Sequence, residues 1–362
     1  MIAIGMVLAL ADTLLIRPGA MVDVERGELR RGLVAVVAGD RIVRVDSAGA
    51  VRPGPGWRVV DLPNATLLPG LIDTHVHLAL AGDPEENLRR TLAAGFTAVR
   101  DLGTGAPPAM SEPAASVTAA YDWVGATGGT CDFQGQGVRG AGEFAARTRA
   151  LIAQGAAVIK VCLTSWWAPA VSFPDSVELT REELDSVVAA AHGARRPVIA
   201  HAIGPAGVQL AIDGGVDGLA HLPRVTAELA RGIAARGMTV SPTAATLLAG
   251  ARGQPWQDQL AASAEAVRAA GIAIVYGTDA GVLPHGMNAR EAMAMQRLGW
   301  SPAEILRSAT TTAARTLGIA APAGTIAAGA RADLVAVEGN PLEDVAALGS
   351  VVLVVRAGRV VE

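Results

Sequence analysis

The chain has 362 residues and 51% of them are hydrophobic, so a large buried core is expected and intrinsic disorder is excluded. The formal net charge is −4, with acidic and basic residues interspersed. We therefore expect no nucleic-acid partner, because such proteins carry a basic stripe. We also expect no membrane partner, because a membrane span needs about 20 consecutive apolar residues.

The first residues, Met1 to Ala11, are apolar but lack the basic start of a secretory signal. We expect an N-terminal strand or an upstream start codon there. The two cysteines, Cys131 and Cys162, imply no disulfide framework. A cytoplasmic location is the resulting expectation.

Both ends of the chain carry short predicted strands separated by turn signals. Neither end has enough strands for a stable sheet, so we predict that the two ends meet. Residues 1–66 and 322–362 would then form one small β-sandwich domain. The predicted strands are Thr13–Ile16, Leu33–Val37, Arg41–Val45, Arg58–Asp61, Asp333–Val337, Val351–Val355 and Arg359–Val361.

Between the ends, short apolar runs alternate with Ala-rich amphipathic segments. One such segment is the predicted helix Arg181–His192, with Thr180 as N-cap and Glu183 completing a capping box. Repeated βα units predict an α/β fold, a (β/α)₈ TIM barrel over residues 67–321. A doubly wound sheet is the alternative, but the Gly-rich phosphate turn typical of it is absent. The runs are Leu71–His77, Phe96–Asp101, Tyr121–Ala126, Ala157–Leu163, Pro197–His201, Val216–His221, Met238–Pro242 and Ile272–Asp279.

Side chains that bind metals stand at or near the ends of these runs. They are His75, His77, Lys160, His201, His221 and Asp279. Barrel enzymes place their active sites at the C-terminal ends of the strands, so we expect these groups to converge. Two residues apart on a strand, His75 and His77 point to the same side and can bind one metal. Imidazole and carboxylate suit Zn²⁺, Mn²⁺ or Fe²⁺ better than Ca²⁺.

Among the 30 basic residues, Lys160 is the only lysine. An amine can lose its proton and react, whereas a guanidinium stays charged. Four neutral imidazoles and one Asp supply too little negative charge for two divalent ions. A carbamate formed from Lys160 and CO₂ would supply the missing anion and bridge both metals. A Schiff-base or salt-bridged lysine is the competing role.

The chain resembles the amidohydrolase superfamily, in the branch of imidazolonepropionase-like enzymes and prolidase-like dipeptidases of Xaa-Pro or Xaa-Arg type. The resemblance covers nearly the whole chain. The matching segments are Pro69–His77, Val99–Gly103, Val158–Val161, His201–Ala202, Gly215–His221, Gly277–Gly281, Pro284–Gly286 and Gly324–Val335.

This resemblance implies a role for each ligand. His75 and His77, with Lys160 and Asp279, would hold the first metal. Lys160 as carbamate, with His201 and His221, would hold the second, and a hydroxide would bridge the two ions. Bound metal lowers the pKa of water from 15.7 toward about 7, and Asp279 would pass its proton to the leaving amine. Lys160 would act as an electrostatic scaffold.

Some residues depart from the family pattern. Prolidase-like relatives carry a histidine after Thr-Gly-Gly, where Thr130 stands here, and a His or Tyr where Ile203 stands. Both changes remove polar groups that could bind a dipeptide. Trp166 and Trp167 form a local aromatic cluster, read either as a wall for an apolar or aromatic substrate or as loop packing.

Two further residues have open roles. His285 either contacts substrate or orients a ligand. Cys162 shares the inward face with Lys160 and is expected to be a small buried filler.

These features predict hydrolysis of an amide or peptide-like C–N bond in a small-molecule substrate. The resemblance implies a homo-oligomer, because relatives are often homo-oligomeric. A lactone or phosphoester substrate is the alternative on the same centre. Deamination is disfavoured, because Gly204 replaces the Glu that such enzymes place three residues after His201. A metal-free binding protein is the third reading, and the complete ligand set argues against it.

Overall fold

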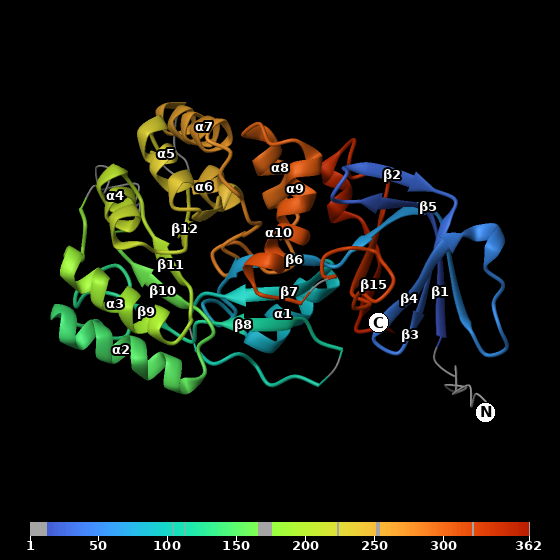
Figure 1. The fold of residues 1–362 in the computed structure, drawn as a ribbon, viewed down its shortest axis with the longest axis horizontal. Helices are drawn as coiled ribbons and strands as arrows, with labels where there is room; N and C mark the ends of the chain where they lie inside the picture. Colours follow the sequence, from blue (N-terminus) through green and yellow to red (C-terminus); the bar gives the residue numbers. More distant parts are fainter. Residues whose placement is uncertain are drawn as a thin grey trace, which may run out of the picture.

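The computed structural model describes residues 13–103, 105–111, 113–165, 176–222, 224–250, 254–320 and 322–361. Strands from the two ends of the chain share one sheet, and an α/β body follows from the middle of the chain (Figure 1). The expectation for the first eleven residues falls outside the described part.

The sheet built from both ends has the order β16-β15-β14-β5-β1-β3-β4, with β2 paired to β1. Its central strand β5 runs parallel to β1 and antiparallel to β14, with Leu334 opposite Pro69. The C-terminal strands are thereby hydrogen-bonded to the N-terminal ones, as predicted. The strands are β1 Thr13–Asp23, β2 Glu28–Arg31, β3 Leu33–Ala38, β4 Arg41–Ser47, β5 Arg58–Pro69, β14 Leu334–Glu338, β15 Val351–Arg356 and β16 Arg359–Val360.

The body has the alternating order of a TIM-barrel-like α/β fold. One parallel sheet has the order β13-β12-β11-β10-β9 and another the order β6-β7-β8. The extended segment 272–280 connects them, through single parallel bridges from Ile274 to Val240 on β13 and from Ala280 to Val76 on β6. The strands are β6 Leu71–Val76, β7 Phe96–Asp101, β8 Ser116–Ala119, β9 Trp123–Val124, β10 Ile159–Cys162, β11 Val198–His201, β12 Gly218–Ala220 and β13 Thr239–Ser241.

Helices follow most of these strands and pack against the outside of the sheets (Figure 1). Helix α3 begins as predicted, because the hydroxyl of Thr180 accepts the N–H of Glu183, and the Glu183 carboxylate accepts the N–H of Thr180. The helices are α1 Pro84–Ala93, α2 Gly140–Gln154, α3 Arg181–Gly193, α4 Pro205–Gly214, α5 Ala227–Ala235, α6 Ala244–Gly250, α7 Gln254–Ala269, α8 Arg290–Arg297, α9 Pro302–Ser308 and α10 Thr311–Thr316. Two short 3₁₀ helices are η1 Ala48–Ala50 and η2 Val345–Gly349.

The third predicted run differs from the structure. Two short strands replace it: β8 pairs with β7, and β9 pairs with β10. Tyr121 lies between them with φ of +67°, a left-handed conformation that interrupts an extended segment. The predicted run Tyr121–Ala126 therefore contains β9, but its bounds are wrong and β8 lies outside it.

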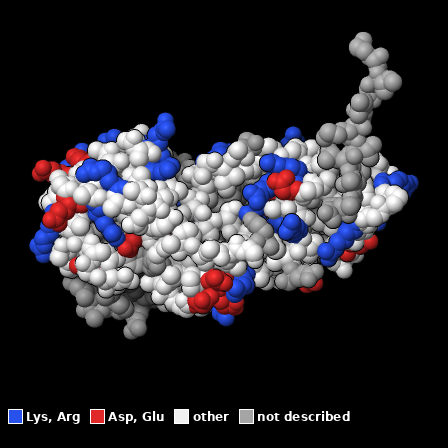
Figure 2. All heavy atoms as spheres, turned by 90° about the horizontal axis from the view of Figure 1, so that it is seen from below, with Lys and Arg blue, Asp and Glu red and all other residues white. Residues whose placement is uncertain are grey.

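Charged side chains of both signs lie side by side on the face shown in Figure 2. Several are paired along a helix, as where Arg89 contacts both Glu85 and Glu86 on α1. Among the helices described, none combines the length and apolar character that crossing a bilayer demands.

Candidate metal centre

Two histidines at the end of β6 and one aspartate after segment 272–278 form the first part of the site. His75 and His77 are buried, and their Nε2 atoms lie 3.3 Å apart. The Asp279 carboxylate Oδ1 lies 3.1 Å from Nε2 of His77 and 3.4 Å from Nε2 of His75. Donor atoms of the three residues all lie within 4.8 Å of one another. This is an N,N,O donor set of the kind that divalent transition metals prefer.

The remaining predicted ligands lie beside this group. The ring of His221 lies 5.2 Å from that of His75 and 4.7 Å from that of His201, measured between centroids. Lys160 on β10 lines the same cavity as His77, His201 and His221. The space that these side chains enclose is about 10 Å³. The structure therefore brings together all six side chains that the sequence analysis singled out.

The donor set and one unsatisfied polar atom show that these residues fit a bound cation. Nζ of Lys160 is buried and has no hydrogen-bond partner among the described residues. Buried polar atoms without partners cost free energy, so a donor cluster of this kind requires compensation. Metal ions, with CO₂ added to the amine of Lys160, would provide it.

Burial sets the protonation of the cluster. It lowers the pKa of His201 to about 3, helped by the positive charge of Lys160, and it lowers the pKa of His75 and His221 as well. Burial also lowers the pKa of Lys160 to about 7, against the opposing effect of Asp279. For Asp279, burial raises the pKa, but the hydrogen bond and charge of His77 outweigh it and hold the pKa at about 2. Neutral imidazoles and a carboxylate are the forms that bind metal.

The backbone is strained at two of the candidate metal ligands. His221 has φ of +74° and Asp279 has φ of +61°, a left-handed region that non-glycine residues rarely adopt. Thr243, with φ of +47°, places its hydroxyl oxygen 2.8 Å from Nδ1 of His221. Strain of this kind is typical of functional sites that the surrounding fold holds in place.

Asp73 is a buried acid that the sequence analysis missed. Its Oδ1 accepts the N–H groups of His75 and Thr278 at 3.1 Å, and its Oδ2 accepts the Thr278 hydroxyl and the Asn288 amide. Burial raises the pKa of Asp73 to about 6. The carboxylate joins β6 to segment 272–279, so it fixes the ligands on both. Asp73 precedes His75 by two residues, and alternate residues of a strand share a face. This spacing could have identified Asp73 from the sequence.

His285 is buried, and both of its ring nitrogens are engaged. Nδ1 lies 2.9 Å from the Thr91 hydroxyl on α1, and Nε2 lies 3.2 Å from the His77 carbonyl. These contacts favour the orienting role over the substrate-contacting one, because they hold the backbone of a ligand. Trp166 and Trp167 lie outside the described residues.

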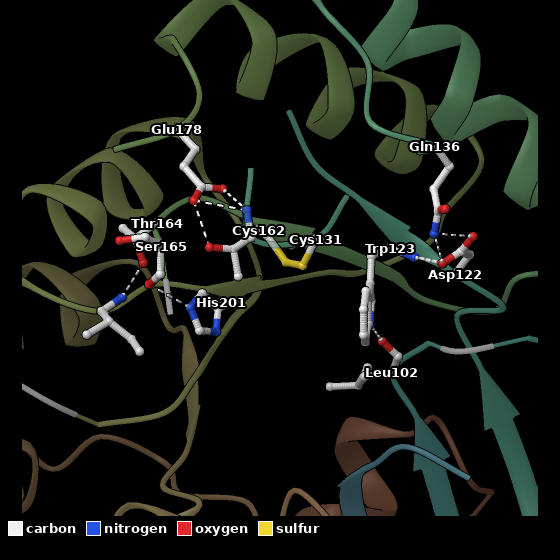
Figure 3. The surroundings of a disulfide bond; sticks show 12 residues. Leu102, Asp122, Trp123, Cys131, Gln136, Cys162, Thr164, Ser165, Glu178 and His201 are labelled. Atoms are coloured by element: carbon white, nitrogen blue, oxygen red, sulfur yellow. Dashed lines mark hydrogen bonds between the residues drawn. A yellow bond between two sulfur atoms is a disulfide. The ribbon is translucent and has the colours of Figure 1, made fainter. Parts of the chain in front are cut away.

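The prediction for the cysteines was wrong. Cys131, in the loop after β9, and Cys162, at the end of β10, form a disulfide with Cα atoms 6.2 Å apart (Figure 3). β9 and β10 are hydrogen-bonded neighbours, with Trp123 opposite Lys160, so the two cysteines meet despite a separation of 31 residues. Cys162 does face the cavity with Lys160, as predicted, but as half of a cross-link and not as a free filler.

The sequence of residues 66–361 matches the Amidohydrolase family. Among curated proteins, the chain is 31% identical over 221 residues to an ochratoxinase of Aspergillus niger. That match covers 57% of this chain and 46% of the relative, so the chain spans about half the length of this curated relative.

Two solved structures resemble the whole chain. One is described as an amidohydrolase, with a TM-score of 0.87, 26% identity, and coverage of 96% of this chain and 98% of that chain. Another is a Xaa-Pro dipeptidase with bound methionine in the active site, with a TM-score of 0.84, 27% identity, and coverage of 97% and 100%. The predicted resemblance to the prolidase-like branch is confirmed.

Proposed function

Because the chain belongs to the amidohydrolase family, we propose that it is a binuclear metal-dependent hydrolase of amide or peptide-like C–N bonds. The substrate class is a small amide with an apolar or aromatic group. The observation that supports the proposal is the buried cluster of four histidines, one aspartate and one unpartnered lysine amine around one cavity.

Each side chain has a proposed place in the centre. His75, His77 and Asp279 would hold one ion, and His201 and His221 the other, with Lys160 between them as a carbamate. Zn²⁺ is the proposed metal, and Mn²⁺ or Fe²⁺ fits the same donors. When bound, the metal pair supplies Lewis-acid activation of water and of the substrate carbonyl.

The modification of Lys160 follows from its environment. A neutral amine attacks CO₂, the N–C bond forms, and one proton leaves the nitrogen, so the neutral amine becomes an anionic carbamate. Burial lowers the pKa of Lys160 to about 7, which makes the neutral amine available near neutral pH. An arginine could not take this role, because its guanidinium does not lose its proton.

Asp279 is the proposed proton carrier. Its pKa of about 2 keeps it a carboxylate at neutral pH, able to accept a proton from the attacking water. The same group would then deliver the proton to the leaving amine. Asp73, His285 and Thr243 would hold the ligands in position, through the contacts described above.

A screen of zinc- or manganese-loaded protein tests the proposal. The panel holds N-acyl amino acids, dipeptides, cyclic amides and lactones, with metal-stripped protein as the control. We expect metal-dependent cleavage of amides. Cleavage of lactones alone would establish the alternative reaction, and no turnover in fully metal-loaded protein would favour a binding protein.

The finer architecture and setting are proposals as well. We propose a closed (β/α)₈ barrel over residues 67–321 and a β-sandwich from residues 1–66 and 322–362, assembled as a homo-oligomer without nucleic-acid or membrane partners. A cytoplasmic location is proposed too, although disulfides are rare in reducing compartments. The redox state of Cys131 and Cys162 in intact cells tests the location.

A further inference from the structure

The wall of the metal cavity beside β9 is made of apolar groups. Trp123, Cys131 and Cys162 line the cavity together with the metal-binding side chains. The Trp123 ring lies edge-on to the His77 ring, with centroids 5.5 Å apart. Figure 3 shows the disulfide between Trp123 on one side and His201 on the other. This wall therefore borders the place where the scissile bond of a substrate would lie.

The polar atoms of this wall are already engaged. The Trp123 indole N–H donates to the Leu102 carbonyl at 2.6 Å. The Glu178 carboxylate accepts both the N–H and the hydroxyl of Thr130. The Asp132 carboxylate accepts the N–H groups of Gly128 and Gly137, which lower its pKa. The loop 126–138 contains no Lys or Arg. This loop therefore offers no cation to an anionic substrate group.

The apolar wall continues to the outside through Phe133. Its ring lies 5.2 Å from that of Trp123, and the residue is 59% exposed. The disulfide at Cys131 and the Glu178 contacts at Thr130 fix the backbone just before it. Phe133 therefore places an exposed aromatic ring next to Trp123 on an anchored loop, and aromatic rings contribute strongly to interface energetics.

The size of the cavity requires such a surface. The space enclosed by its lining residues is only about 10 Å³. Ligand pockets usually measure about 300–1,000 Å³. The rest of a substrate must therefore lie outside this space. Exposed apolar residues in the chain segments after β6, after β10 and after segment 272–280 are Leu80, Val177, Val282 and Met287.

We infer that Phe133 and Trp123 bind an uncharged aromatic or apolar group of the substrate, which makes Phe133 a specificity-determining residue. This inference rests on the proposed function and deepens it. The aromatic or apolar group of the substrate packs on the face of Phe133 that adjoins the Trp123 ring, while the amide of the substrate enters the cavity. A second copy of the chain covering Phe133 is the competing occupant, and it becomes an outcome of the test.

The test compares uncharged amides that differ by one phenyl group. N-methylacetamide carries none, N-methylbenzamide has it on the acyl side, and N-benzylacetamide has it on the amine side. Hydrolysis and calorimetric binding are measured with zinc-loaded full-length protein. Phe133→Ala should lower kcat/KM and affinity for a phenyl-bearing amide about tenfold, with under about twofold change for N-methylacetamide. Phe133→Leu should recover part of the loss.

The matched control is Val43→Ala, which removes a 50% exposed apolar side chain from β4. It should leave every amide unchanged. An equal loss for all amides in Phe133→Ala, a change in its oligomeric state, or no phenyl preference in the unaltered protein would overturn the inference. If no amide is hydrolysed, the proposed function fails, and the binding measurement still decides the role of Phe133.

Discussion

Removing the Cys131–Cys162 cross-link should destabilise the protein by an amount set by its loop. The two cysteines are 31 residues apart, and closing a loop of that length reduces the entropy of the unfolded chain. The chain-entropy relation gives about 4 kcal/mol for such a loop at 25 °C. An unfolding entropy of about 2.1 cal/mol/K per residue gives a Tm shift of about 1.3 °C per kcal/mol for a chain of 362 residues, so a loss of about 5 °C is expected.

The assay compares Cys131→Ser and Cys131→Ala with the unaltered protein, each with and without a dithiol reductant. Both variants lose the cross-link, but only serine buries a hydroxyl, so their shared loss measures the cross-link. Reductant should lower the Tm of the unaltered protein to that of Cys131→Ala and leave the variants unchanged. If the unaltered protein shows two alkylatable thiols without reductant, or if the variants match it in Tm, the reasoning is refuted.

Further predictions concern the site and its supports. Lys160→Arg should reduce activity more than about a hundredfold while the Tm stays near its original value, and full activity would rule out the carbamate. Asp279→Asn should lower kcat by about 10²–10⁴-fold with metal content largely kept, and an unchanged rate would remove Asp279 as proton carrier. Burial raises the pKa of Glu291 to about 8, although it accepts the N–H groups of Ala244 and Ala245. The folded state therefore binds the proton of the Glu291 carboxyl more tightly than the unfolded state does. As the pH rises from about 4.5 to about 8, the free energy of unfolding should fall by up to about 1.4 kcal/mol per pH unit. Glu291→Gln should remove this dependence of the free energy of unfolding on pH. An unaltered slope in the variant would contradict the raised pKa of Glu291.

Most of the fold could be predicted from periodicity and turn signals. Apolar runs bounded by Gly and Pro located the buried strands, and the Thr180 capping box located the start of α3. Backbone conformations with positive φ could not be foreseen, so the interruption at Tyr121 was missed. Strand β2 was missed as well, because Glu28–Arg31 is polar and lies exposed at the edge of its sheet.

The convergence of the six candidate ligands could be predicted because strand ends converge in a parallel α/β fold. The supports could not, since Asp73, Thr243 and Asn288 act through contacts between segments far apart in sequence. The disulfide was missed for the same reason. Two lone cysteines carry no local pairing signal, and only the adjacency of β9 and β10 brings them together.

Metal stoichiometry tests the central claim most directly, because six side chains around one cavity should hold two ions. Mass spectrometry of zinc-supplemented, extensively dialysed protein should give about two equivalents per chain. The Lys160→Arg variant, with its fold intact, should bind less. Less than one equivalent in the unaltered protein, with a normal Tm, would contradict the account.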